Sequence, residues 1–85
     1  MKYEELLVRI FIPAFNSQIE LFVPLNLEIK YILPMLASLL NENKKGYLLN
    51  QNRLNLYDLE LKLLLRNDDT LNNYNINSNS LLILI

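Results

Sequence analysis

Few side chains in this chain of 85 residues are suited to catalysis or metal binding. The four carboxylates of its C-terminal half all fall within residues 58–69. Asp58, Glu60, Asp68 and Asp69 could form a metal site or an acid–base pair. A catalytic carboxylate needs a pKa shifted by a cleft, and nothing in the surrounding sequence predicts one. We expect Asp68 and Asp69 to lie in a solvated turn and to cap the short helical turn that follows.

The residue types needed for most enzyme chemistry are missing. The chain contains no Cys and no His, which excludes zinc–thiolate sites and cysteine nucleophiles and removes the commonest general base and metal ligand. No nucleophile–base pair is available. We therefore expect no enzyme activity, no catalytic or metal-binding residue and no cofactor.

Composition indicates one small globular domain spanning residues 1–85, with 52% hydrophobic residues and a net charge of −1. Acidic and basic residues are interspersed, which argues against a nucleic-acid partner. Residues 1–5 are acidic where a signal peptide would be basic. The longest apolar stretch, Tyr31–Leu40, is about half as long as a membrane span. We expect a cytoplasmic protein without direct membrane insertion.

The fold that positions these side chains is organised around the last five residues, Leu81–Ile85, which are all Leu or Ile. Burying each of these side chains stabilises a fold by about 1.5–3 kcal/mol. A short apolar run after turn residues is typical of a strand buried in a sheet. We therefore place this strand at the centre of the sheet.

Two further strands are predicted near the N-terminus, over Leu6–Ile12 and Gln18–Val23. The short turn between them, residues 13–17, makes the pair an antiparallel hairpin. Alternation assigns one set of side chains to the inner face: Val8, Ile10, Ile12, Ile19, Leu21 and Val23. The outer face carries Arg9, Phe11, Glu20 and Phe22.

A helix follows the hairpin. Its core stripe is predicted to contain Ile29, Leu33, Leu36 and Leu40, with Ile32 and Leu39 beside them and Lys30, Ala37 and Asn41 opposite. Asn26 is suited to cap the start of the helix. Pro34 costs about 3 kcal/mol inside a helix, so we expect a kink there or a distorted first turn.

The end of the helix is predicted at Lys44, Lys45 and Gly46. The two lysines are better explained by the helix dipole than by a binding site. Tyr31 and Met35 fall on the helix flank away from the core stripe. They either pack under the connection that follows, residues 46–52, or form a secondary interaction surface.

The segment after the helix alternates and predicts strands over Arg53–Tyr57 and Leu59–Leu65, with a bulge or tight turn at Tyr57–Asp58. A polar turn and one helical turn, Thr70–Tyr74, then lead to the last strand. We expect the strand order 2-1-5-3, with the last strand parallel to the first.

This succession of hairpin, helix, strands, helical turn and final strand resembles the β-grasp fold. Thr70-Leu71-Asn72-Asn73-Tyr74-Asn75-Ile76, followed by Ser80-Leu81-Leu82-Ile83-Leu84, resembles the end of ubiquitin. The resemblance implies an α+β, ubiquitin-like fold, with a mixed sheet of four or five strands packed on one helix. It also implies that Tyr74 is a core residue. We expect its hydroxyl to bond to the backbone near Arg66–Asp68.

A closer resemblance is carried by Ile19-Glu20-Leu21-Phe22-Val23-Pro24-Leu25-Asn26-Leu27-Glu28-Ile29-Lys30, which is similar to the second strand and helix start of bacterial YukD/EsaB-like ubiquitin-fold proteins. That family belongs to the type VII (ESX/WXG-type) secretion loci of Gram-positive bacteria. The resemblance implies a small cytoplasmic component or regulator that binds proteins of the secretion machinery and is recruited to the membrane-bound complex. The alternative is a ubiquitin-like interaction module outside secretion. Because the sequence stops at Leu84-Ile85 without a Gly-Gly tail, we do not expect conjugation.

The outer face of the sheet is the candidate interaction surface. In a β-grasp fold the helix covers one face only, and the other face should be mostly polar. Here alternation predicts that Phe11, Phe22 and Ile83 form one apolar strip, which Leu81 joins if the register holds. A contiguous apolar patch indicates an interface with a protein partner or with a second copy in a homodimer. The candidate residues are Arg9, Phe11, Glu20, Phe22, Ile83 and Ile85, with Arg9 and Glu20 as the polar margin.

Overall fold

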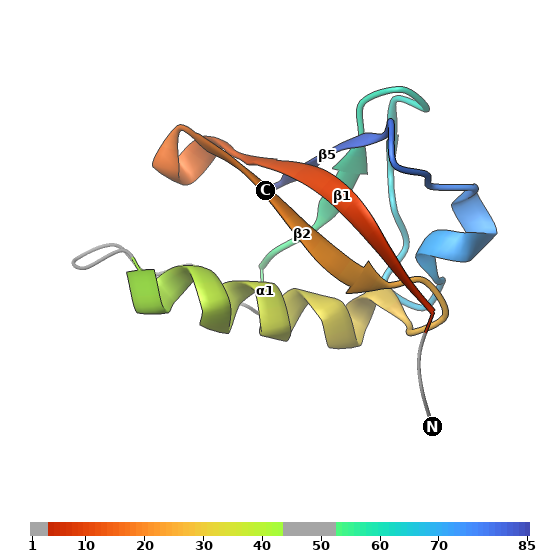
Figure 1. Cartoon of the computed structure of the whole chain (residues 1–85), viewed down its shortest axis with the longest axis horizontal. Coiled ribbons are helices and arrows are strands. Elements are labelled where there is room, and N and C mark those ends of the chain that lie inside the picture. Colours follow the sequence, from red (N-terminus) through yellow and green to blue (C-terminus); the bar gives the residue numbers. More distant parts are fainter. Residues whose placement is uncertain (1–3, 44–52) are drawn as a thin grey trace.

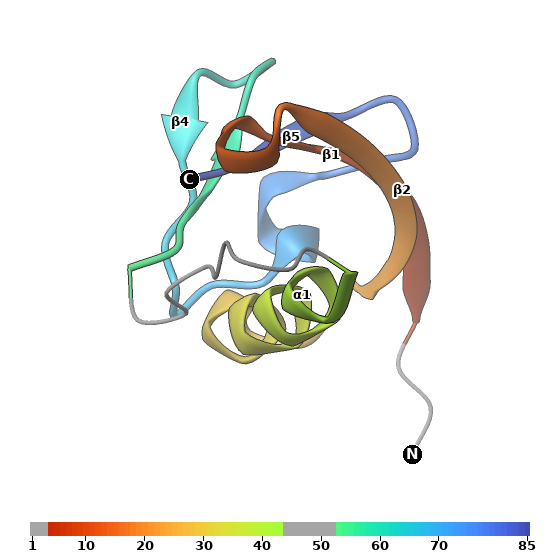
Figure 2. The ribbon, with the colours of Figure 1, turned by 90° about the vertical axis from the view of Figure 1, so that its left-hand side faces the viewer.

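The computed structural model describes residues 4–43 and 53–85, which form a mixed five-stranded sheet with a helix against one face (Figure 1). The strands are β1 (Glu5–Ile12), β2 (Ser17–Pro24), β3 (Leu56–Asp58), β4 (Leu63–Leu64) and β5 (Leu81–Leu84). The helix, α1, runs from Ile29 to Asn43, and two short 3-10 helices span Pro13–Phe15 and Leu71–Tyr74. Figure 2 looks along α1 and shows the sheet curving over it.

The strand order is β2-β1-β5-β3-β4, which confirms the predicted order 2-1-5-3 and adds β4 at one edge. β5 lies in the middle, parallel to β1 and antiparallel to β3. The predicted central position of the last strand is therefore correct. Ile85 lies just beyond β5, where its backbone exchanges two hydrogen bonds with Asn55.

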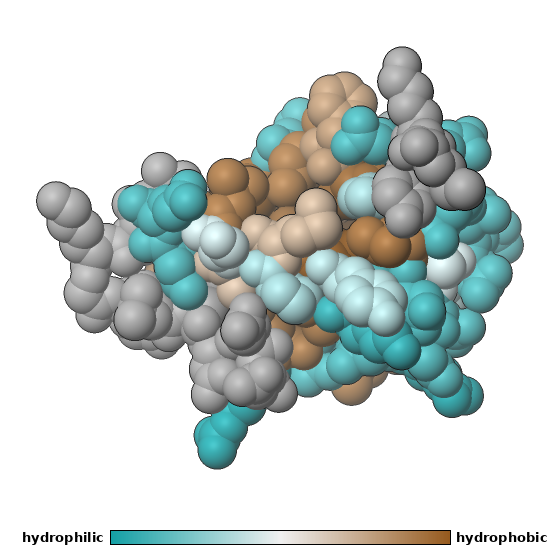
Figure 3. Space-filling view, turned by 90° about the horizontal axis from the view of Figure 1, so that it is seen from below, coloured by the Kyte–Doolittle hydropathy of each residue, from teal (hydrophilic) through white to brown (hydrophobic). Residues whose placement is uncertain are grey.

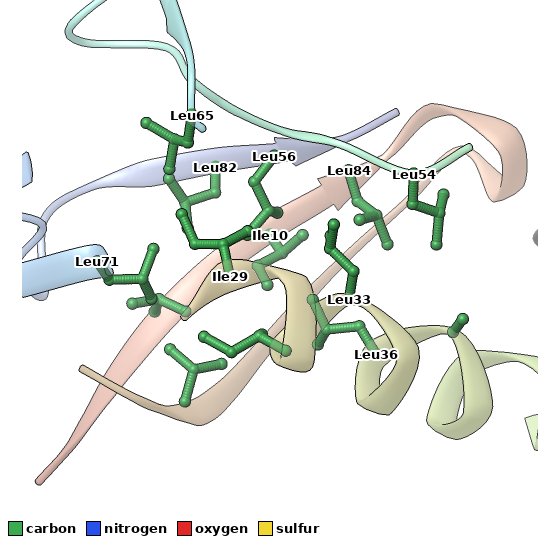
Figure 4. Packing of buried hydrophobic residues seen from close by; sticks show 14 of the residues in the cluster. Ile10, Ile29, Leu33, Leu36, Leu54, Leu56, Leu65, Leu71, Leu82 and Leu84 are labelled. Carbon is green, nitrogen blue, oxygen red and sulfur yellow. The ribbon is translucent and has the colours of Figure 1, made fainter. Parts of the chain in front are cut away.

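The core fills the space between α1 and the inner face of the sheet (Figure 4). The predicted inner residues Val8, Ile10 and Ile12 are fully buried. Two helix predictions were wrong: Ala37 is buried, and Leu39 is 45% exposed. Ala37 follows Leu33 by four residues and therefore lies on the same helix face, whereas Leu39 is turned out of the stripe.

The start of α1 is capped by a loop that is distant in the sequence. The backbone N–H groups of Ile29 and Lys30 donate to the carbonyls of Asp69 and Asn67, each at 2.9 Å. The prediction that Asn26 caps the helix was wrong, because α1 begins at Ile29 and its first donors are already satisfied by these carbonyls. A bridge between Glu28 and Thr70 extends the contact.

Pro34 lies within α1, which runs through it without interruption. Pro34 has no N–H to offer the carbonyl of Lys30. Both residues are exposed, so water can satisfy that carbonyl. The predicted helix end at Lys44–Gly46 lies outside the described residues.

Turns in the described residues use Asn and Lys at positions where glycine is common. Asn16, Lys62 and Asn75 have φ of 49°, 55° and 56°. Asn is enriched among non-glycine residues in this left-handed region. The hairpin turn and the turn before β5 thus form without glycine.

The predicted strands over Arg53–Tyr57 and Leu59–Leu65 are shorter in the structure, because a turn occupies residues 59–62. The buried Asp58 carboxylate accepts a hydrogen bond from the N–H of Glu60 at 3.0 Å and a longer one from Leu61 at 3.5 Å. This local bonding ends β3. The prediction of a bulge or tight turn at Tyr57–Asp58 was wrong, because both residues belong to β3 and the turn follows them. Asp58 is buried, with only 2% of its surface exposed.

Candidate protein-interaction surface

The outer face of the sheet is built from rows of side chains, because residues directly opposite one another on neighbouring strands share a face. One row crosses all five strands. The register places its members side by side in the order Gln18, Phe11, Ile83, Tyr57 and Leu64. Four of these five residues are apolar or aromatic.

The second row separates the predicted apolar strip into two parts. It contains Glu20, Arg9 and Leu81, which lie opposite one another on β2, β1 and β5. Beyond this row, Phe22 pairs with Leu7. The prediction of one strip with Arg9 and Glu20 at its margin was therefore wrong: these two residues lie between Phe22 and Phe11.

The guanidinium of Arg9 is held on the β5 side of this row. Its Nη2 donates to the carbonyl of Asn79 at 3.0 Å. Glu20 is exposed, and no ion pair among the described residues includes it. The row therefore leaves one unpaired carboxylate on β2.

The larger apolar part, which we call the sheet patch, consists of Phe11, Tyr57, Leu64, Leu81 and Ile83. Leu64 is 47% exposed and the other four are half-buried. Ile85, 50% exposed, continues the alternation of Ile83 past the end of β5. Tyr57 and Leu64 could not be assigned to this surface from the sequence. The turn after Asp58 interrupts the alternation by which the side chains of β3 and β4 would be assigned to a face.

The two secondary candidates occupy different surroundings on α1. Met35 lines a groove of about 250 Å³ between α1 and β2. Tyr31 is exposed, with the Nζ of Lys30 5.4 Å from the centre of its ring, and does not line the groove. The alternative contact with residues 46–52 lies outside the described residues.

Tyr74 ties the loop that caps α1 to the segment before β5. Its hydroxyl accepts a hydrogen bond from the Arg66 N–H at 3.0 Å and donates to Oδ2 of Asp69 at 3.1 Å. The predicted bond to the backbone of residues 66–68 is confirmed, although Tyr74 is only partly buried. The helical turn is capped by Thr70, whose Oγ1 accepts from the Asn73 N–H at 3.3 Å, so the prediction that Asp68 and Asp69 cap it was wrong.

Replacing Tyr74 with phenylalanine should lower the free energy of unfolding by about 0.5–1.5 kcal/mol, because the Arg66 N–H and Asp69 lose their partner. Urea unfolding followed by circular dichroism measures the change. Tyr57→Phe is the matched control, since no hydrogen bond joins the Tyr57 hydroxyl to another described residue. An equal effect in the two variants would contradict the role assigned to the Tyr74 hydroxyl.

The charged side chains near the capping loop form two exposed ion pairs. The hydrogen bond that Lys30 donates to Glu28, at 3.2 Å, raises the pKa of Lys30. The hydrogen bond that Arg66 donates to Asp68, at 3.1 Å, raises the pKa of Arg66. Exposed pairs of this kind contribute little to stability. Both described basic residues that line the open hollow beside them, Lys30 and Arg66, belong to these pairs.

The described residues contain no group of three or more side chains placed to hold a metal ion. Within residues 4–43 and 53–85, no helix has the length and apolar character that a membrane crossing requires.

Comparisons with known proteins identify the fold. No protein-family model and no curated protein sequence matches the chain. The EccD5 ubiquitin-like domain from Mycobacterium xenopi superposes with a TM-score of 0.78 at 17% identity, covering 96% of this chain and 93% of that one. Ubiquitin from Caldiarchaeum subterraneum gives 0.72 at 16% identity, covering 96% and 92%. The N-terminal ubiquitin-like domain of the 4931431F19Rik protein gives 0.77 at 19% identity, covering 99% and 76%.

These similarities, together with the sheet order and the single helix against one face of the described sheet, show a ubiquitin-like β-grasp fold.

Proposed function

We propose that this chain is a non-catalytic, ubiquitin-like accessory component or regulator of a bacterial type VII secretion system, and that it acts by binding a protein partner through the sheet patch. The observation that carries this proposal is the apolar row that crosses the face of the sheet opposite α1. The secretion context rests on the resemblance of Ile19–Lys30 to the YukD/EsaB-like proteins. A bacterial ubiquitin-like domain of nearly the same extent, EccD5, is among the similar structures.

The sheet patch has the make-up of a protein interface. Neighbouring strands lie about 4.8 Å apart, so its side chains form a continuous apolar surface. Phe11 and Tyr57 supply aromatic area, and the polar residues Gln18, Arg9 and Glu20 border it on β1 and β2. Aromatic anchors with a polar rim are typical of the residues that dominate binding energy.

The partner would be a component of the secretion machinery, and the protein would act in the cytoplasm at the membrane-bound complex. A homodimer formed through the same patch and a ubiquitin-like interaction role outside secretion are the two alternatives. The proteins that bind to the sheet patch in a pull-down distinguish these alternatives from the secretion role.

Ile83→Lys should weaken partner binding about tenfold or more, because it puts a charge at the centre of the patch. Leu64→Ser, at the edge of the patch, should have a smaller effect. The measurement is a pull-down from native cells with mass spectrometry, which scores recovery of FtsK-like ATPases and WXG-type small proteins. Light scattering of the purified chain measures self-association.

Tyr31→Ser is the matched control, because Tyr31 is 53% exposed on α1 and lies outside the patch. Thermal melting of every variant must stay close to that of the wild type. Recovery of secretion components that is equal in Ile83→Lys and wild type would overturn the role of the patch. Capture of unrelated proteins alone would favour the alternative outside secretion.

A further inference from the structure

A second surface, distinct from the sheet patch, lies where the chain turns from β3 into β4. Residues 59–63, which we call the leucine turn, alternate leucine with charge: Leu59, Glu60, Leu61, Lys62 and Leu63. The three leucines are 46%, 49% and 45% exposed, in that order. Single exposed leucines are common on protein surfaces, but several in one short turn indicate an interface.

The leucine turn lies where another molecule can reach it. In both Figure 1 and Figure 2 the chain between β3 and β4 stands on the side of the sheet away from α1. Because β4 is an edge strand, no further strand of the described sheet covers the turn. Leu64, the last residue of β4, belongs to the sheet patch, so the two surfaces adjoin there.

Hydrogen bonds hold the backbone of the leucine turn in one conformation. The Asp58 carboxylate accepts from the N–H groups of Glu60 at 3.0 Å and Leu61 at 3.5 Å. The N–H of Leu59 donates to the carbonyl of Leu81 in β5 at 3.2 Å. A turn that is ordered before binding loses little conformational entropy when a partner covers it.

Lys62 has a backbone conformation that is unfavourable for a lysine. Its φ is 55°, in the left-handed region where residues other than glycine, Asn and Asp are uncommon. Strained backbone of this kind occurs most often at functional sites. Glycine would fit the position better, so a lysine there indicates that its charged side chain has a role.

The charges of the leucine turn distinguish it from the apolar surface on the opposite side of the molecule. Seen from the helix side, hydrophobic surface gathers in the upper middle, with hydrophilic side chains bordering it (Figure 3). In the leucine turn the charged residues lie between the leucines. Neither the Glu60 nor the Lys62 side chain has an ion pair or hydrogen bond within residues 4–43 and 53–85. The turn therefore presents one unpaired carboxylate and one unpaired ammonium group.

The order of residues in the turn is symmetric about Leu61, with opposite charges at equivalent positions. Two copies that meet about a two-fold axis near Leu61 run in opposite directions. Glu60 of each copy then lies beside Lys62 of the other, because a two-fold contact is made twice. The same axis places Leu59 of one copy beside Leu63 of the other. A second copy of the turn is therefore complementary to the first in both charge and apolar character.

We infer that the leucine turn is a self-association surface, through which two copies of this chain pair about a two-fold axis with Glu60 of each beside Lys62 of the other. A lipid surface is a poorer occupant, because proteins that lie on membranes carry an excess of Lys and Arg, whereas the turn has no net charge. Stable interfaces use about 20–30 residues a side, so a contact centred on one turn should have a dissociation constant of about 0.1–1 mM. Such pairing does not depend on the proposed function, in which a secretion component binds the sheet patch.

Charge reversal tests the two-fold pairing on the full chain. Glu60→Lys and Lys62→Glu each give the turn two like charges, so each variant alone should self-associate about tenfold more weakly than the wild type. An equal mixture of the two variants should recover the pairing, because each turn then meets one of opposite charge. Sedimentation equilibrium at concentrations up to about 1 mM measures the dissociation constants. Concentration-dependent amide shifts in two-dimensional NMR spectra locate the contact.

Three controls separate pairing from net charge and from exposed leucine in general. Leu61→Ser should weaken self-association about tenfold, because its side chain lies nearest the axis. Leu39→Ser, at a leucine 45% exposed on α1, should not. Glu42→Lys changes the net charge by as much as Glu60→Lys and also lies on α1, so it should leave the pairing intact.

Lys62→Gly separates self-association from stability. Glycine suits the positive φ, so this variant should melt at the same temperature as the wild type or higher, while it pairs more weakly for lack of the ammonium group. Ile83→Lys, outside the turn, should leave the pairing unchanged while it lowers recovery of secretion components. Failure of the pairing and failure of the proposed function are therefore distinguishable.

A wild-type chain that stays monomeric up to about 1 mM would overturn the inference. So would a mixture of Glu60→Lys and Lys62→Glu that associates no more tightly than either variant alone. Concentration-dependent shifts that leave residues 59–63 unaffected would place self-association on another surface. Binding of the turn to vesicles of anionic lipid, without self-association, would assign it to a membrane instead.

Discussion

Replacing Leu82 with alanine should lower the free energy of unfolding by about 2–5 kcal/mol. Leu82 is fully buried in β5, the central strand, where it lies opposite Ile10 on one side and Asp58 on the other. Truncation removes apolar contact area and leaves a cavity where the sheet meets α1. Small domains are stable by only about 5–15 kcal/mol, so the variant should be close to unfolding at body temperature.

The matched control for Leu82→Ala is the next residue on the same strand. Ile83 points to the outer face and is half-buried, so Ile83→Ala should cost about 1 kcal/mol. Urea unfolding curves with equal slopes would give both values. Equal costs for the two variants would contradict the assignment of inner and outer faces in β5.

The second large effect is expected at Asp58. Asp58→Ala should lower the free energy of unfolding by about 1–2 kcal/mol, because the N–H groups of Glu60 and Leu61 lose the carboxylate that holds the turn. The loss should spread to the short β3–β4 pair, which the turn connects. Denaturant unfolding gives the magnitude, and amide hydrogen exchange shows where protection is lost.

Asp58→Asn separates the hydrogen bond from the charge. The side-chain oxygen of Asn can accept the same bond from the Glu60 N–H, so this variant should retain most of the stability. If Asn is as damaging as Ala, the carboxylate acts through its charge, and the turn geometry does not explain the effect.

Much of the architecture could be predicted because it follows from local patterns. Alternation predicted which side chains of β1 and β2 point inward, and the apolar run at the end of the chain predicted the central strand. Where a local hydrogen bond competed with the pattern, prediction failed. The alternating leucines at positions 59 and 61 indicated a strand, but the Asp58 carboxylate turns the backbone there.

Contacts between distant segments could not be predicted from local sequence. The cap of α1 comes from carbonyls of residues 67–69, which no motif near Asn26 could indicate. The outer-face residues were assigned to the right face by alternation, but their grouping depends on the register between strands. That register puts Arg9 and Glu20 between Phe22 and Phe11 and brings Tyr57 next to Ile83.

The central position of β5 has a consequence for the kinetics of folding. β1 and β3 make no ladder with each other and are joined only through β5, which comes late in the sequence. The β1–β2 hairpin can form from neighbouring residues, but the sheet closes only when a distant segment docks between its two halves. Contacts of such large sequence separation slow folding, because the entropy of loop closure opposes them before they stabilise the chain. Until that docking step, both backbone edges of the hairpin lack partners, which makes this the stage at which the chain is most prone to aggregate.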